Sequence, residues 1–310
     1  MTVKRDFLTL SDFTRDELTS LLLVAGKLKH GGKAGRPLQG KSVGLLFATS
    51  STRTRVSFEV GAHQLGAHPV FLSAHDILLE PGELLHGTAR VLSRYLDLLV
   101  VRADAHAEAV ELAQHATVPV INGRTNLLHP CQVLGDLLTV RESLGSWEGK
   151  IVAWVGDGNN VANSWMDAAG RLGFELRLAC PEGYEPDREL FERNQSHTKI
   201  MITEEPEEAV AGAHVVSTDA WTRPGHEADA EQRHQAFQGY TVTGALLDLA
   251  APEAVFLHCL PAHRGEEVEQ AVLEGPRSRV WEQAENRLHV QKALLLELMG
   301  KTADPHERRS

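Results

Sequence analysis

A complete strand, helix and strand pattern stands at residues 151–179, which read IVAWVGDGNNVANSWMDAAGRLGFELRLA. The apolar run 151–155 and the run 175–179 both predict buried strands, and the residues between them predict a turn followed by a helix. Two strands joined through a helix pair in parallel, with a right-handed crossover. This stretch therefore predicts one unit of a parallel α/β layer.

The same alternation continues on both sides of this stretch. A helix with a capping box at Thr14 and Glu17 opens the chain, and the glycines Gly145 and Gly149 mark a boundary between two domains. We therefore predict an α/β fold of two doubly wound parallel-sheet domains linked by helices. The other predicted strands cover 42–48, 69–73, 98–102, 118–121, 200–203, 215–218 and 255–258, and long helices are predicted at 132–144 and 286–299.

Composition excludes several classes of protein. The 310 residues are 42% hydrophobic and 24% charged, which is ordinary for a globular chain. The net charge of −11 argues against non-specific binding to nucleic acid or to an anionic membrane. Three cysteines without a CxxC pair favour a reducing compartment, and no apolar run approaches the roughly 18 residues of a membrane span. We expect a cytoplasmic protein.

The run Ser51-Thr52-Arg53-Thr54-Arg55 follows the first predicted strand and precedes a helical pattern. Free N–H groups, hydroxyls and guanidinium groups meet at such a helix start, and together they can hold a phosphate dianion. The alternative is a plain N-cap followed by solvated arginines. We favour an anion site.

Three other patterns suggest different functions. Gly35 to Ser42 satisfies the P-loop pattern, but it leaves a helix and enters a strand, which is the wrong context. The turn Gly156 to Val161 lacks the third glycine of a dinucleotide fingerprint, so a polar small-molecule contact is preferred to a nicotinamide cofactor. Cys259, near His258 and Asp219 at strand ends, also admits a cysteine hydrolase, although no obvious base or oxyanion hole accompanies the thiol.

Taken together, the motifs resemble those of the aspartate/ornithine carbamoyltransferase family, and the likeness spans about residues 7–299. The family's motifs occur in order as Ser51 to Arg55, Arg102, His129-Pro-x-Gln132, Gly156 to Asn160, Asp219, His258-Cys-Leu-Pro-Ala-His-Arg-Gly265 and Ala284-Glu-Asn-Arg287.

The resemblance implies a division of labour along the chain. Residues 1–145 would bind carbamoyl phosphate, 146–285 would bind the amino acid ornithine, and 286–310 would form a helix that returns to the first domain, followed by a polar tail. It further implies transfer of a carbamoyl group to the side-chain amine of ornithine, giving citrulline and phosphate in arginine metabolism. It implies a homotrimer or a multiple of one, with sites at subunit interfaces and no metal or organic cofactor.

The resemblance also assigns roles to residues at matching positions. Catalytic roles fall to Arg102, His129, Cys259 and Arg287. Carbamoyl phosphate would contact Ser51, Thr52, Arg53, Thr54, Arg102, His129, Gln132, Cys259, Leu260 and Arg287. Ornithine would contact Asn160, Asp219, Arg223 and Pro224.

The chain departs from the family pattern at three places. Thr49 replaces a usual lysine, Leu78 replaces a usual glutamine, and Arg223-Pro224 replaces Ser-Met in the acceptor loop. These changes leave two alternatives open, namely a carbamoyltransferase for a different amine and a non-catalytic paralogue that binds carbamoyl phosphate. A panel of amine acceptors would separate them.

Overall fold

The computed structural model describes residues 4–31, 35–73, 85–222 and 229–301. The chain forms two compact units, residues 1–135 with 285–310 and residues 136–284. Their boundaries fall inside two helices, α5 (Pro130–Leu144) and α12 (Val280–Leu298). Each unit is built on a parallel sheet flanked by helices, so the predicted fold class is confirmed.

The first unit has a four-stranded parallel sheet in the order β2-β1-β3-β4. Its strands are β1 (Ser42–Phe47), β2 (His68–Ser73), β3 (Leu98–Arg102) and β4 (Val120–Arg124). The chain goes from β1 to a neighbour on one side, then returns to build β3 on the other side. This reversal creates a switch point between β1 and β3, and ligands of open α/β sheets bind at the carboxyl ends beside such a point.

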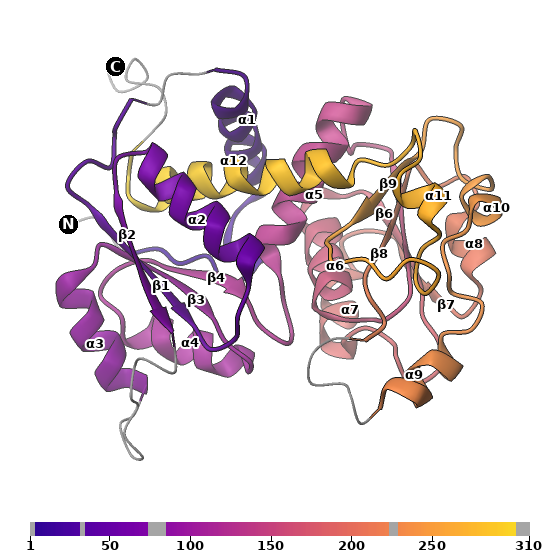
Figure 1. Cartoon of the computed structure of the whole chain (residues 1–310), viewed down its shortest axis with the longest axis horizontal. Helices are drawn as coiled ribbons and strands as arrows, with labels where there is room; N and C mark the ends of the chain where they lie inside the picture. The colour runs from indigo at the N-terminus through magenta and orange to yellow at the C-terminus, as the bar shows by residue number, and fades with distance from the viewer. Residues whose placement is uncertain (1–3, 32–34, 74–84, 223–228, 302–310) are drawn as a thin grey trace. The chain divides into compact units, whose positions relative to one another are not determined.

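Helices cover both faces of this sheet (Figure 1). On one face lie α3 (Leu85–Tyr95) and α4 (His106–His115), where Ala89 and Leu112 pack with Leu99 and Val101 of β3. On the other face lie α1 (Arg15–Lys29), α2 (Thr52–Gln64) and α12. A short 3-10 helix, η1 (Leu10–Asp12), precedes α1.

The second unit has a five-stranded parallel sheet in the order β7-β6-β5-β8-β9, with its switch point between β5 and β8. Its strands are β5 (Ile151–Val155), β6 (Glu175–Ala179), β7 (Ile200–Thr203), β8 (Val215–Thr218) and β9 (Val255–His258). All five match the predicted bounds. The apolar runs of β5 and β9 are buried along nearly their whole length, as expected for parallel strands covered on both faces, whereas β6 alternates in burial and β7 at the sheet edge is only partly buried.

Two groups of helices flank the second sheet (Figure 1). One group is α6 (Asn160–Leu172) and α7 (Arg188–Asn194), and the other contains α8 (Pro206–Val210), α10 (Gly244–Leu247) and α11 (Gln270–Leu273). The second group packs on a hydrophobic core of this unit, which includes Phe237 and Phe256. A further helix, α9 (Ala230–Ala236), lies between β8 and α10 in the chain.

A few predicted elements are shifted along the chain. The capping box at Thr14 and Glu17 is confirmed, with the Glu17 amide donating to the Thr14 hydroxyl and the Thr14 amide donating to the Glu17 carboxylate. The strand predicted at 118–121 instead begins at Val120, directly after Pro119, which has no N–H to donate to a sheet. The helix predicted at 132–144 begins at Pro130, since proline suits the first helical position.

Among the described residues, no helix is both long enough and apolar enough to cross a membrane.

Candidate functional site

The switch point of the first unit is lined by the residues that follow β1 and β3. Phe47 and Arg102 are register partners, so both strands end at the same level. The Arg102 Nε donates to the Thr49 hydroxyl over 2.9 Å. Thr49, which stands where the family usually has lysine, therefore orients a predicted catalytic arginine.

The Ser51 to Arg55 run opens α2, as the sequence predicts. Ser51 is the N-cap, and its hydroxyl accepts a hydrogen bond from the Thr54 amide over 3.3 Å. Thr52 and Arg53 are exposed at the first helical positions, while Thr54 is buried. The helix start thus presents a hydroxyl and a guanidinium group to solvent beside backbone N–H groups, which is the arrangement that binds a phosphate.

Arg287 reaches the same helix from the far end of the sequence. Its Nη2 donates to the Thr54 hydroxyl over 2.8 Å, and both side chains are buried. These residues are 233 positions apart in the chain, so only the return of α12 to the first unit brings them together. The contact joins two of the residues that the resemblance assigns to carbamoyl phosphate.

His129 and Gln132 lie at the start of α5, the helix that follows β4. The His129 carbonyl accepts the Gln132 amide, and both side chains are buried. The neighbouring thiol of Cys131 is fully buried, and this burial raises its pKa to about 12. Cys131 is therefore protonated at neutral pH and is not a nucleophile.

In the second unit, Asp219 follows β8 and is held by three donors. The Asn159 amide nitrogen lies 3.1 Å from its Oδ2, while its Oδ1 accepts from the Ala220 amide at 2.9 Å and from the Cys259 thiol at 2.8 Å. Asn159 is also the N-cap of α6. The next residue, Asn160, is buried inside the helix, and its carbonyl accepts from Ser164. The structure therefore joins Asp219 and Cys259 and adds Asn159, which the resemblance does not assign.

The loop after β9 holds Cys259 in a constrained backbone. Leu260 has a φ of 54°, a left-handed conformation that costs a residue with a side chain about 1–2 kcal/mol. Its amide donates to the His258 Nδ1 over 2.8 Å, so the ring proton sits on Nε2, which faces the Glu267 carboxylate at 3.1 Å. Both ring nitrogens of His258 are engaged in these contacts. The imidazole is thus not placed as a base for Cys259, which argues against a cysteine hydrolase.

Two further alternatives conflict with the local structure. A side chain at Gly158 would overlap the backbone of Glu185 and Pro186, so this glycine is explained by a close approach of the chain itself rather than by a dinucleotide. The P-loop interpretation of Gly35 to Ser42 is wrong, because Ser42 begins β1 instead of a helix. The run acts as the connecting turn that its context predicts.

One residue that links two loops of the second unit was not found by sequence reasoning. The Arg233 Nη2 donates to Asp157 in the turn after β5, and its Nε donates to the Trp221 carbonyl, each over 2.5 Å. Arg233 thus ties the turn after β5 to the segment after β8. No local signal marks it, because its partner Asp157 is 76 positions away.

Three residues named in the sequence analysis, Leu78, Arg223 and Pro224, lie outside the described residues.

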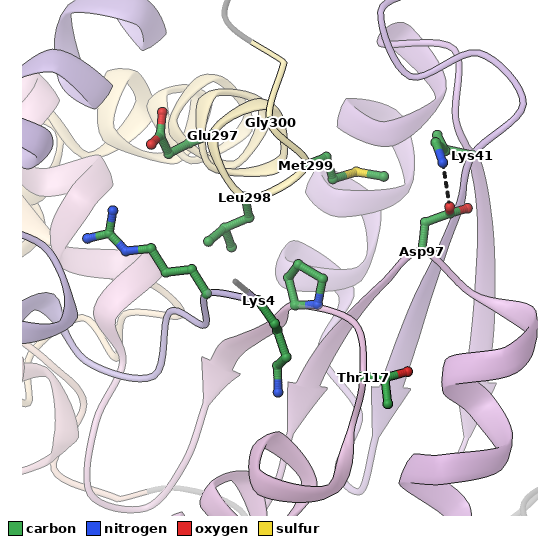
Figure 2. Close-up of a pocket in the computed structure, with 10 residues that line it drawn as sticks. Lys4, Lys41, Asp97, Thr117, Glu297, Leu298, Met299 and Gly300 are labelled. Carbon is green, nitrogen blue, oxygen red and sulfur yellow. Dashed lines mark hydrogen bonds and ion pairs between the residues drawn. The ribbon is translucent and has the colours of Figure 1, made fainter. Parts of the chain in front are cut away.

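A separate pocket of about 390 Å³ lies at the other end of the strands of the first sheet, away from the switch-point residues (Figure 2). Lys41, Asp97 and Pro119 in its lining directly precede β1, β3 and β4, so the pocket lies at the amino ends of these strands. Lys41 and Asp97 form an ion pair of 2.7 Å. None of the residues that line this pocket is among the predicted site residues.

Comparison with known proteins gives matches over almost the whole chain. Residues 5–142 match the carbamoyl-P binding domain of aspartate/ornithine carbamoyltransferase, and residues 148–298 match its Asp/Orn binding domain. The chain belongs to the aspartate/ornithine carbamoyltransferase family.

Individual relatives and solved structures agree with this assignment. The ornithine carbamoyltransferase of Geobacter sulfurreducens is 52% identical over 300 residues, which cover 95% of this chain and 99% of that protein. That of Symbiobacterium thermophilum is 52% identical over 304 residues, covering 96% and 98%. The structure of ornithine carbamoyltransferase from Pyrococcus furiosus has a TM-score of 0.92 at 45% identity, covering 97% of this chain and 98% of that one. That from Thermus thermophilus has a TM-score of 0.89 at 44% identity, covering 96% and 100%.

Proposed function

We propose that this family member transfers the carbamoyl group of carbamoyl phosphate to the side-chain amine of ornithine, giving citrulline and phosphate. The observation that carries the proposal is the start of α2, where exposed Thr52 and Arg53 stand beside Thr54, which is bonded to Arg287. Relatives about half identical over nearly the full chain carry the name ornithine carbamoyltransferase, which supports ornithine as the acceptor.

Carbamoyl phosphate would be held by the first unit. The proposed phosphate ligands are Ser51, Thr52 and Arg53, because a helix start with a guanidinium group provides charge-assisted hydrogen bonds to an anion. Negative charge grows on the carbonyl oxygen when the amine attacks, and preorganised donors lower the barrier by stabilising it. The donors proposed for this oxygen are Thr54, Arg102, His129 and Arg287, and Gln132 would bind the carbamoyl amide.

Ornithine would be held by the second unit. Asp219 has both carboxylate oxygens fixed by neighbours, so it presents a preoriented negative charge to the acceptor's ammonium group. Asn160, Arg223 and Pro224 are proposed to complete the acceptor site. Cys259 and Leu260 are proposed to lie beside the reacting groups, where the constrained loop fixes their positions.

The attacking amine must lose its proton before it reacts. An amine with a pKa of about 10.4 is neutral in about one molecule of 2,500 at pH 7, a cost of about 4.6 kcal/mol. Positioning of the two substrates can offset several kcal/mol of this barrier. The proposed reaction should therefore accelerate as the pH rises above 7, until other groups titrate.

We also propose a homotrimer in the cytoplasm, acting in arginine biosynthesis without a cofactor. All three cysteines are free thiols, which agrees with a reducing compartment. Light scattering at micromolar concentration tests the assembly, and the mass of a monomer would contradict it.

The decisive experiment is a colorimetric carbamoylation assay with ornithine and a panel of other amines. Citrulline formation supports the proposal, while turnover of a different amine alone would identify another acceptor. Binding of carbamoyl phosphate without any product would indicate a non-catalytic paralogue.

Arg53→Ala tests the phosphate site in the same assay. It should abolish turnover, because hydrogen bonds to charged groups contribute about 1.5–3 kcal/mol each. Arg55→Ala is the matched control, since Arg55 on the same helix is already paired with Glu59 at 2.9 Å and lies over the Phe71 ring. Wild-type turnover in a folded Arg53→Ala variant would refute the assignment.

A further inference from the structure

The loop between β9 and α11 gathers three side chains that the proposed reaction does not use. These are His263, Glu266 and Glu267, called here the His263 cluster. The His263 Nδ1 lies 3.7 Å from the Glu266 Oε2 and 3.9 Å from the Glu267 Oε2. Both separations exceed the 2.7–3.2 Å of an ordinary N–H···O hydrogen bond. Direct hydrogen bonding therefore does not explain why these atoms face one another.

The same three atoms are buried and have no hydrogen-bond partner among the described residues. Glu267 is the most demanding of them, because its side chain is 0% exposed. Its Oε1 accepts from His258 Nε2 and from the His263 amide, at 3.1 and 2.6 Å, which leaves Oε2 directed at the cluster. A buried carboxylate oxygen without a donor is unfavourable, so this oxygen needs a positive partner, which is either the charged form of the His263 imidazole at 3.9 Å or a cation bound between the two groups.

We propose that the His263 cluster binds a divalent first-row metal ion, with Zn²⁺ as the ion that fits the donors best. One imidazole and two carboxylates form a ligand set that zinc accepts, at about 2.0–2.2 Å from each donor. Two such donors at a tetrahedral angle stand about 3.4 Å apart. All three donor atoms lie within 4.8 Å of one another, and the two distances to His263, 3.7 and 3.9 Å, need to contract by a few tenths of an ångström.

A fourth donor is available on α9. The His234 Nε2 lies 3.8 Å from the Glu266 Oε2, a spacing similar to those within the cluster. Both side chains are about two-fifths exposed, so water can also fill this position. The metal would then be held by three or four protein ligands.

A second group of possible ligands, Asp219, His258 and Cys259, lies nearby, but its donor atoms are occupied. The Cys259 thiol donates to the Asp219 Oδ1, and the His258 ring binds the Leu260 amide and Glu267. A metal there would have to break these bonds, whereas the His263 cluster offers atoms without hydrogen-bond partners. His258 instead orients Glu267 from the outer side, as residues behind metal ligands commonly do.

Metal content of the full-length protein tests the proposal. Chelator-stripped protein is dialysed against Zn²⁺, and bound zinc is measured by mass spectrometry beside the midpoint of thermal unfolding. We expect about one zinc per chain and a higher midpoint with zinc, because a ligand that binds the folded state stabilises it. The double variant His263→Gln/Glu266→Gln should weaken zinc binding more than about 10-fold and lose the shift in midpoint, since loss of even an outer partner costs about that much.

Matched controls separate this site from the rest of the loop. Glu274→Gln removes a nearby exposed carboxylate that pairs with Arg264, and it should leave zinc binding unchanged. Glu266→Gln alone changes only a partly exposed side chain, so it keeps the test valid if the double variant fails to fold.

Cobalt identifies the ligands directly. Bound to nitrogen and oxygen, Co²⁺ should give visible bands without an intense thiolate charge-transfer band, and Cys259→Ser should not change them. Zinc binding that survives Glu266→Gln undiminished, a thiolate band lost in Cys259→Ser, or no binding in the wild type would each overturn the proposal. None of these outcomes depends on carbamoyl transfer.

Discussion

Replacing Thr54 by valine tests whether the contact made by α12 serves catalysis. Valine keeps the shape of threonine but lacks the hydroxyl that accepts the Arg287 Nη2 over 2.8 Å. A hydrogen bond to a charged group contributes about 1.5–3 kcal/mol, and about 1.4 kcal/mol corresponds to a factor of ten. If the bond holds Arg287 in its working position, kcat/KM for carbamoyl phosphate should fall about 10- to 150-fold.

Steady-state kinetics at saturating ornithine measure this ratio, and circular dichroism confirms the fold. Thr19→Val is the matched control, because it removes a threonine hydroxyl that bonds to the Arg15 carbonyl on the outer surface of α1. The control should retain kcat/KM within about twofold, as expected for a surface change. A folded Thr54→Val enzyme with wild-type kcat/KM would refute the role given to this bond.

Two other variants test stability. Glu17→Gln should lower the free energy of unfolding at pH 7 by at most about 1 kcal/mol, because the pair with Arg5 is partly exposed. The hydrogen bond from Arg5 lowers the pKa of Glu17 to about 2, against about 4.3 in the unfolded chain. The difference in unfolding free energy between variant and wild type should therefore persist above about pH 4.5 and vanish as the pH falls to about 2. Urea titrations that gave a constant difference across this range would contradict it. Gly170→Ala should destabilise by about 1–3 kcal/mol, since the added methyl group would overlap the Asn194 amide, although alanine ordinarily favours a helix. Thermal unfolding measures this effect. A rise in the midpoint would contradict the expected loss of stability and would show that α7 moves far enough to accommodate the added methyl group.

Sequence patterns predicted the elements that depend on local chemistry. The strands β5 to β9 follow from short apolar or alternating runs, and the start of α2 follows from the capping preference of Ser51 and the hydrogen-bonding residues after it. Ligand chemistry at a helix start is local in the same way, so the anion site proposed at the start of α2 rests on five consecutive residues.

Contacts between distant segments were not predictable in this way. Nothing near Arg287 indicates that it binds Thr54, and nothing near Arg233 indicates Asp157, because both contacts depend on tertiary packing. The choice between Asn159 and Asn160 depends on the residue at which α6 begins. The helix begins at Asn160, so Asn159 becomes the cap and turns its amide toward Asp219.

The discontinuous first unit has a consequence for synthesis on the ribosome. The second unit is one uninterrupted segment, whereas the first unit needs residues 285–310 to become complete. About 150 residues separate the two parts of the first unit, which at about 5–20 residues per second corresponds to roughly 7–30 s of elongation. At the end of that interval the second unit has all of its own sequence, while Arg287, the partner of Thr54, has not yet been synthesised. A premature stop just after Ala284 would spare the whole second unit and yet remove a residue proposed to contact the carbamoyl group.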